Sequence, residues 1–117
     1  MIYVVIGEWH DYDCSSHWLV KGFYSKGEAD SLARELQGHH DRLYADFMDE
    51  SHALSKWQTE FLKKHSAIMW TKLAPKDRAE YDARTNEFWE SHSENPYDSG
   101  DQIDSMTEYR VVELEVE

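Results

Sequence analysis

The chain has 117 residues, the size of a single domain with one hydrophobic core. It carries 24 acidic and 12 basic side chains, so its formal net charge is −12. Because phosphate recognition depends on clusters of lysine and arginine, this charge argues against direct nucleic-acid binding and against an anionic membrane surface. The aromatic fraction of 14% excludes a disordered acidic tail, since such tails contain few aromatic residues.

The excess acid is concentrated late in the sequence. Residues 1–38 carry a net charge of −3, residues 39–74 are neutral, and residues 75–117 carry −9. Three quarters of the net charge therefore belongs to the last 43 residues. Charge of this kind describes a surface and its partners, not a fold.

Three further features define the expected setting. No apolar run reaches the roughly 20 residues that a membrane-spanning helix needs. The opening segment MIYVVIGEWHD has no basic residue before its apolar run, so we expect no secretory signal. Cys14 is the single cysteine, which excludes an internal disulfide and favours a cytoplasmic location.

The first quarter of the chain predicts a β-hairpin. Residues 2–6 read IYVVI, a β-branched and aromatic run that is apolar on both faces. Residues 17–24 read HWLVKGFY and form the expected return strand. The two strands can extend through Trp9 and His17, which leaves a polar tip around residues 11–16.

Helical patterns dominate the middle of the chain. Ser25 and Glu28 form a capping box ahead of a helix expected from Lys26 to Leu36, with Gly38 as its stop. Residues 41–73 contain no Gly or Pro and predict further helix, with a break near His65 and Ser66. Pro75 then opens a helix expected over residues 76–91.

The chain ends in a polar loop, residues 93–107, and a strand over residues 108–117. In that strand Val112, Leu114 and Val116 alternate with glutamates, which predicts one apolar and one acidic face. The resulting order is β-β-α-α-α-β. We expect one α+β domain over residues 1–117, a three-stranded antiparallel sheet with a long helical segment, residues 39–92, inserted before the last strand. The doubly apolar first strand takes the middle of the sheet.

The large apolar residues of the middle segment follow a heptad-like spacing. They could pack on their own domain or form a helical seam with a second copy of the chain. The residues of this candidate self-association seam are Leu43, Phe47, Leu54, Trp57 and Phe61.

The hairpin tip is a weak candidate metal site, because Cys and His occur there with ligand-like spacing. Its residues are His10, Asp13, Cys14 and His17. A solvent-exposed turn has the same composition, so we expect no bound metal and no cofactor. The chain contains no G-x-S-x-G, H-E-x-x-H, G-x-G-x-x-G or P-loop motif, and we expect no enzymatic activity.

The acidic C-terminal part is the candidate partner-binding surface. Its carboxylates recur every three or four residues and could mimic a nucleic-acid strand in the basic groove of another protein. Exposed tryptophan and tyrosine would serve as anchors. The residues are Glu87, Glu90, Glu94, Asp98, Asp101, Asp104, Trp89 and Tyr97. The same acid would also simply keep a small aromatic-rich protein soluble.

The opening strand, hairpin and capped helix together resemble those of small phage-encoded accessory proteins. The residues that carry this resemblance are Tyr3, Val4, Val5, Gly7, Gly22, Phe23, Tyr24, Ser25 and Glu28, with the strand Tyr109–Glu117. The resemblance implies a phage protein in the host bacterial cytoplasm. It also implies an inhibitor of a host defence or nucleic-acid-binding enzyme, of the anti-restriction or anti-CRISPR type. It transfers no catalytic residues, and residues 39–92 depart from it.

Overall fold

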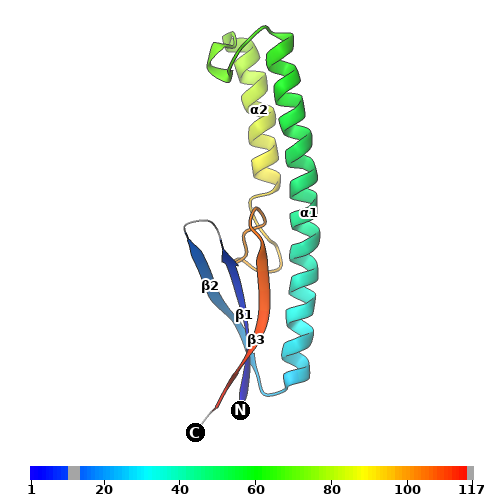
Figure 1. The fold of residues 1–117 in the computed structure, drawn as a ribbon, viewed down its shortest axis with the longest axis vertical. Coiled ribbons are helices and arrows are strands. Elements are labelled where there is room, and N and C mark those ends of the chain that lie inside the picture. The colour runs from blue at the N-terminus through cyan, green and yellow to red at the C-terminus, as the bar shows by residue number, and fades with distance from the viewer. Residues whose placement is uncertain (11–13, 116–117) are drawn as a thin grey trace. The chain divides into compact units, whose positions relative to one another are not determined.

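The computed structural model describes residues 1–10 and 14–115. In chain order it contains strands β1 (Ile2–His10) and β2 (Ser15–Phe23), helix α1 (Lys26–Lys64), a short 3-10 helix η1 (Trp70–Lys72), helix α2 (Pro75–Ser91) and strand β3 (Thr107–Leu114) (Figure 1). The predicted α+β class is confirmed. The sheet is antiparallel with the order β2-β1-β3, so the doubly apolar strand is in the middle, as expected.

The chain divides into two compact units, each with its own hydrophobic cluster. Residues 1–45 and 94–117 form the first, which we call the sheet unit. Residues 46–93 form the second, which we call the hairpin unit because it contains α2 and the part of α1 that packs against it. The first turns of the predicted helical insertion, residues 39–92, therefore belong to the sheet unit, which extends to residue 45.

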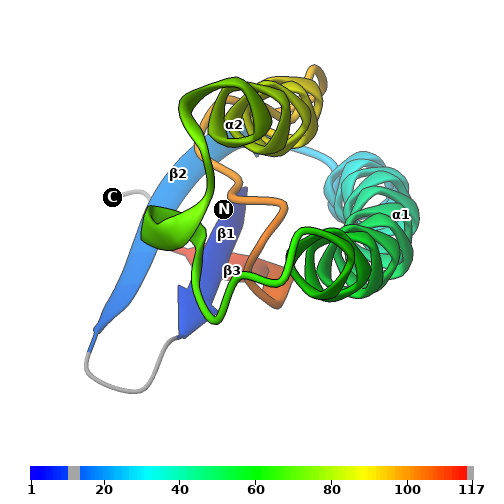
Figure 2. The ribbon, with the colours of Figure 1, turned by 90° about the horizontal axis from the view of Figure 1, so that it is seen from above.

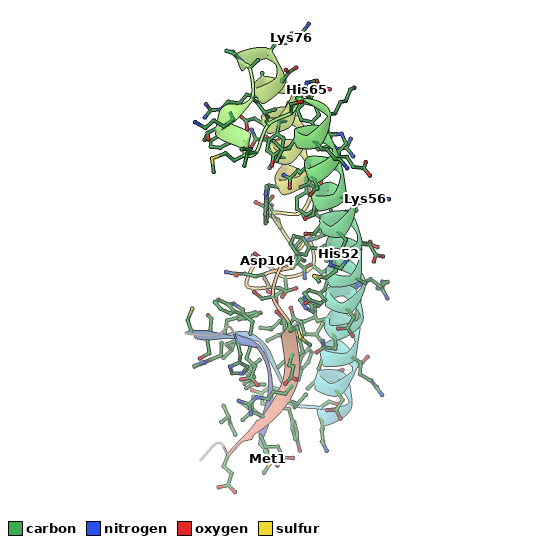
Figure 3. All side chains as sticks on the ribbon, turned by 45° about the horizontal axis from the view of Figure 1, so that its top comes forward. Met1, His52, Lys56, His65, Lys76 and Asp104 are labelled. Carbon is green, nitrogen blue, oxygen red and sulfur yellow. The ribbon has the colours of Figure 1, made fainter. Side chains whose placement is uncertain are left out.

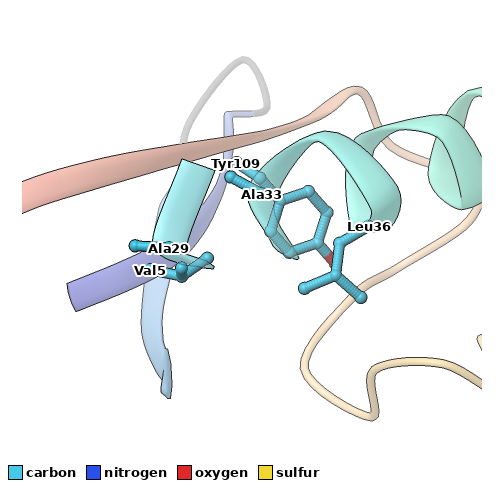
Figure 4. Close-up of a cluster of buried hydrophobic side chains, with 5 residues drawn as sticks. All are labelled: Val5, Ala29, Ala33, Leu36 and Tyr109. Atoms are coloured by element: carbon cyan, nitrogen blue, oxygen red, sulfur yellow. The ribbon is translucent and has the colours of Figure 1, made fainter. Parts of the chain in front are cut away.

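In the sheet unit the first part of α1 packs on one face of the sheet (Figures 1 and 2). Val5 of the central strand is fully buried there, and Ala29, Ala33 and Leu36 form the apolar stripe of the helix. Figure 4 shows the ring of Tyr109 from β3 beside Ala33 and Leu36. This face of the sheet accounts for one of the two apolar sides of β1.

Helix α1 begins where the sequence predicts but does not end there. The backbone N–H of Glu28 donates to the Ser25 hydroxyl at 3.3 Å, which is the expected cap. The predicted stop at Gly38 is wrong, because α1 continues to Lys64 without a left-handed residue at the glycine. A glycine inside a helix costs only about 1 kcal/mol, and the packing of His40 on the turn that follows outweighs it.

In the hairpin unit, α1 and α2 pack side by side through aromatic rings. Phe47 meets Phe88 with ring centroids 5.5 Å apart, and Trp57 meets Tyr81 at 5.9 Å. Because residues late in α1 contact residues early in α2, the two helices are antiparallel. The predicted helix over residues 76–91 is confirmed, and it begins one residue earlier at Pro75.

The predicted break near His65 and Ser66 is confirmed by a Schellman turn. The Ala67 N–H donates to the Leu62 carbonyl at 2.9 Å, and the Ser66 N–H donates to the Lys63 carbonyl at 3.1 Å. Ser66 takes the left-handed conformation, with φ of 53°, at the position where glycine is usual. The turn therefore stores strain that its hydrogen bonds hold in place.

We predict that Ser66→Gly raises the free energy of unfolding of the hairpin unit by about 0.5–1 kcal/mol, because glycine adopts positive φ without a steric cost. Urea denaturation followed by tryptophan fluorescence measures the change. Ser66→Ala is the matched control and should give no gain, since alanine keeps the Cβ that causes the strain. Equal effects of the two substitutions would contradict the assignment of strain to this residue.

The two faces of strand β3 point in the directions opposite to those predicted. Tyr109 and Val111 pack towards α1, so the alternation places Glu113 on the helix side of the sheet and Val112 and Leu114 on the opposite side. Val112 and Leu114 thus do not join the core under α1, whereas Tyr109 and Val111 do. The end of the predicted strand, residues 116 and 117, lies outside the described residues.

Candidate partner-binding surfaces

The eight side chains predicted to bind a partner are divided between the two units. Glu87, Trp89 and Glu90 belong to the hairpin unit and are exposed on α2. The other five follow α2 and lie in the sheet unit: Glu94, Tyr97, Asp98, Asp101 and Asp104. Glu94 does not share a helix face with Glu87 and Glu90, because α2 ends at Ser91.

Asp98 is a structural residue of the sheet unit. Its Oδ2 accepts hydrogen bonds from Trp18 Nε1–H at 2.9 Å and from the Tyr109 hydroxyl at 2.7 Å. Its Oδ1 accepts the backbone N–H of Gly100 at 3.1 Å. The carboxylate therefore fastens the segment before β3 to side chains of β2 and β3, and only part of it is open to a partner.

Asp101 is buried, so it leaves the predicted partner-binding set. Its side chain is 0% exposed, and its Oδ2 accepts hydrogen bonds from His40 Nδ1 at 2.7 Å and from Asn95 Nδ2 at 2.6 Å. Burial by itself raises the pKa of this carboxyl. The contacts with His40, Thr107 and Asn95 outweigh burial and hold the pKa of Asp101 below its ordinary value of 3.8.

The ring of His40 has both nitrogens engaged. Its Nε2 accepts the backbone N–H of Thr107 at 3.1 Å, so the proton of the neutral ring is on Nδ1 and points at Asp101. A histidine that acts as a general base needs a free Nε2 lone pair towards its substrate. The buried His–Asp pair resembles part of a catalytic triad in its contacts, but this hydrogen bond from Thr107 blocks that role.

Of the remaining predicted residues, Tyr97 and Trp89 are half-exposed aromatic side chains. The Tyr97 ring stacks on His39 with centroids 3.6 Å apart, and the residue is 56% exposed. Trp89 lies edge-on to Phe88 at 5.2 Å. Glu94 and Asp104 are exposed in the sheet unit and remain available to a partner.

Glu87 borders a shallow cavity of about 260 Å³ between α1 and α2 of the hairpin unit. Glu50 and Arg84 also line it, and Glu50 is 2.9 Å from His92 Nε2. The acidic groups of this cavity therefore already have basic neighbours within the unit, so they attract a basic partner less strongly.

The candidate self-association seam is mostly used inside the chain. Phe47, Leu54 and Phe61 are buried in the hairpin unit. Trp57 packs between Tyr81 and the guanidinium of Arg84, which lies 4.7 Å from the ring centroid. Leu43 is half-buried in the sheet unit. The heptad-like spacing thus reflects packing within the chain, and these side chains are not free to pair with a second copy.

The weak candidate metal site does not assemble among residues 1–10 and 14–115. That part of the chain contains no group of three or more His, Cys, Asp or Glu side chains placed to hold an ion. His10 faces Glu8 at 3.8 Å, Cys14 is exposed, and His17 lies opposite Glu8 in the register. Asp13 lies outside the described residues.

The surface that the sequence did not single out is the face of the sheet opposite α1. Its side chains follow from the register, because residues that alternate with the buried Val5, Tyr109 and Val111 point away from the helix. Leu19 is 68% exposed and Leu114 is 50% exposed on this face. We call it the open face, and its apolar residues are Ile2, Val4, Ile6, Leu19, Val112 and Leu114.

Charged residues border the open face. Glu8 and Glu108 are directly opposite each other in the register at one end of it, and Arg110 Nε is 3.3 Å from a Glu8 oxygen. The sheet unit as a whole has 15 acidic and 5 basic residues, whereas the hairpin unit has nine and seven. Net charges of −10 and −2 follow, so nearly all of the excess acid belongs to the unit that carries the open face.

Compared with protein-family models, with curated proteins and with solved structures, the chain gives no match. Among its described helices none combines the length and the apolar character needed to span a membrane.

Proposed function

We propose that the chain is a non-enzymatic protein that binds a basic partner protein through the open face of its sheet. The observation that carries this proposal is an apolar sheet face on which Leu19 and Leu114 are exposed around the buried Val4, in a unit with a net charge of −10. Exposed apolar patches with polar borders are typical of protein interfaces. Acidic borders select a partner with basic borders and speed its approach.

Two details support binding over chemistry. The buried His40 has no free ring nitrogen, because Asp101 and Thr107 engage both. Leu19 and Leu114, by contrast, are exposed where a partner would bury them, and burial of such a side chain contributes about 1.5–3 kcal/mol. The arrangement therefore favours a binding module.

The finer proposal is that the partner is a host protein and that binding inhibits it. The resemblance to phage accessory proteins supports this step, and it implies an anti-restriction or anti-CRISPR role in the bacterial cytoplasm. A nucleic-acid-binding enzyme fits the charge, because such enzymes have basic grooves that acidic side chains can occupy. In this proposal the exposed Glu94, Asp104 and Glu108 supply the charge that the buried Asp101 cannot.

We predict that the wild-type chain captures a basic protein from bacterial lysate at about 0.1 M salt and releases it at about 0.5 M, because screening shortens the reach of the charges. Leu19→Ser with Leu114→Ser should weaken capture about tenfold or more. Glu108→Lys should weaken it less and flatten its dependence on salt. Quantitative mass spectrometry of the captured proteins measures all three effects.

The matched control is Glu87→Lys with Glu90→Lys, which reverses two exposed charges in the hairpin unit and should leave capture within about twofold, since exposed charges away from an interface change affinity little. Loss of capture in this control, with capture retained by the Leu19 and Leu114 variant, would move the surface to α2 and overturn the proposal. The captured protein, once purified, should lose activity when the wild-type chain is added; unchanged activity would remove the inhibitor role.

A further inference from the structure

The turn that joins α1 to α2 has the opposite charge to the rest of the chain. Residues 63–78 contain five basic residues and one acidic residue, Asp77. Asp77 is also paired with His65, whose Nδ1 is 3.3 Å from its carboxylate. Figure 3 labels His65 and Lys76 at this end of the hairpin unit. We call residues 63–78 the hairpin tip; its basic residues are Lys63, Lys64, Lys72, Lys76 and Arg78.

The hairpin tip also exposes three consecutive apolar side chains. Ile68 is 93% exposed, Met69 is 52% exposed and Trp70 is 37% exposed. Leu73, which follows the triplet in the sequence, is the buried apolar residue of this turn. An exposed isoleucine does not contribute the free energy of stabilisation that its burial would provide. Covering this triplet would therefore stabilise the chain.

The exposed triplet is held in a defined shape. The Schellman turn at Ser66 fixes its start, and the indole N–H of Trp70 donates to Asp82 Oδ1 at 2.6 Å. The guanidinium of Arg78 lies 4.1 Å from the centroid of the Trp70 ring. A surface whose side chains are already ordered loses less conformational entropy when it binds.

We propose that the hairpin tip of one copy docks on the open face of a second copy, so that the chain associates head to tail. The inference rests on the proposed function, because it assigns an occupant to the same face. Both surfaces expose large apolar side chains, Ile68 and Met69 on the tip and Leu19 and Leu114 on the two outer strands of the open face. Their charges also differ: lysine surrounds the hairpin tip, whereas Glu108 and the Glu8–Arg110 pair border the open face.

Charge excludes the two symmetric alternatives. Tip against tip would bring two basic clusters together, each with a net charge of +3 when the Asp82 that binds Trp70 is included, and face against face would bring two units of −10 together. Like charges across an interface repel, whereas the head-to-tail pairing joins opposite charges. A contact of this kind uses two different surfaces, so it continues from copy to copy unless the arrangement closes into a ring. Self-association would therefore compete with the basic partner for the open face.

Mixing two variants tests the proposal. The tip variant carries Ile68→Ser, Lys64→Glu and Lys72→Glu, all at exposed positions, and keeps an intact open face. The face variant carries Leu19→Ser, Leu114→Ser and Glu108→Lys and keeps an intact hairpin tip. Sedimentation velocity at about 0.05 M and about 0.5 M salt measures the mass of each protein alone and of the equimolar mixture.

We expect the wild-type mass to rise above the 13.9 kDa of one chain with concentration at low salt and to fall back at high salt. Each variant alone should weaken association about tenfold or more. Their mixture should form a complex of two chains, because each variant supplies the surface that the other lacks. Lys56→Glu, an exposed change in the hairpin unit outside the tip, is the control and should associate as the wild type does.

Two results would overturn the inference: a wild-type chain that stays monomeric at low salt, or a mixture that stays monomeric when the wild type associates. Neither outcome touches the proposed function, because the tip variant keeps the open face and should capture the basic partner from lysate at least as well as the wild type does. If the face variant loses capture of the basic partner but self-associates normally, the open face binds the partner and not a second copy. That result would overturn the inference and leave the proposed function standing.

Discussion

Replacing Asp98 by alanine is expected to lower the free energy of unfolding of the sheet unit by about 3–5 kcal/mol. Two largely buried donors, Trp18 Nε1–H and the Tyr109 hydroxyl, share its Oδ2 as their acceptor. A hydrogen bond to a charged group contributes about 1.5–3 kcal/mol, and a buried donor left without an acceptor costs about 1–3 kcal/mol. The loss of both bonds therefore adds to a large effect at one position.

Urea denaturation followed by tryptophan fluorescence measures this loss. Asp104→Ala is the matched control, because Asp104 is an exposed acid of the same segment, and it should change stability by less than about 0.5 kcal/mol. Asp98→Asn should be intermediate, since the amide oxygen can still accept but carries no charge. A loss for Asp98→Ala no larger than that of the control would contradict the role assigned to this carboxylate.

The Asp98 contacts also explain two glycines. A Cβ at Gly100 would lie about 2.5 Å from the Trp18 indole nitrogen, and a Cβ at Gly7 would collide with the same ring from β1. Trp18 therefore fits between two positions that must lack a side chain. The sequence shows both glycines but gives no reason for them, because the tryptophan that needs them lies elsewhere in the chain.

Local patterns predicted the elements well. The capping box at Ser25, the break at His65 and Ser66, and the proline that opens α2 all depend on neighbours within one turn. The position of β1 in the middle of the sheet followed from its two apolar faces. The stop at Gly38 failed, because the buried ring of His40, two residues on, is held by Asp101 and Thr107 far along the chain.

The candidate site was predicted less well for the same reason. Regular spacing made Asp98 and Asp101 look like surface acids, and only contacts 11 or more residues away in sequence show that they are structural. The open face could be predicted in part from the sequence, since β1 is apolar on both sides and one helix layer covers only one of them. Its borders could not be foreseen, because Val112 and Leu114 were assigned to the buried side.

The second large effect is expected for His40→Ala, which should cost about 3–5 kcal/mol at neutral pH. The substitution removes the His40 Nδ1–H donor, 2.7 Å from the fully buried Asp101 carboxylate, and leaves the Asn95 donor at 2.6 Å. Losing the hydrogen bond from the neutral His40 ring is costly because the Asp101 carboxylate stays buried with one donor fewer. The N–H of Thr107 loses its acceptor as well. His10→Ala, at an exposed histidine of the same unit, is the control and should change stability by less than about 0.5 kcal/mol.

The dependence on pH makes this prediction specific. In the wild type the pKa of Asp101 is held below the 3.8 of the unfolded chain, so its contribution to stability is complete above pH 3.8 and is lost as the pH falls through the lower folded-state value. In His40→Ala the strongest lowering contact is gone, so the pKa of Asp101 rises above its wild-type value. The variant should therefore take up a proton at a higher pH, and the gap in stability between it and the wild type should narrow as the pH falls from 7 towards 3.8. Urea midpoints measured across this range test the prediction. A gap that stays constant with pH would show that His40 stabilises the unit by packing alone, and not by its hydrogen bond to Asp101.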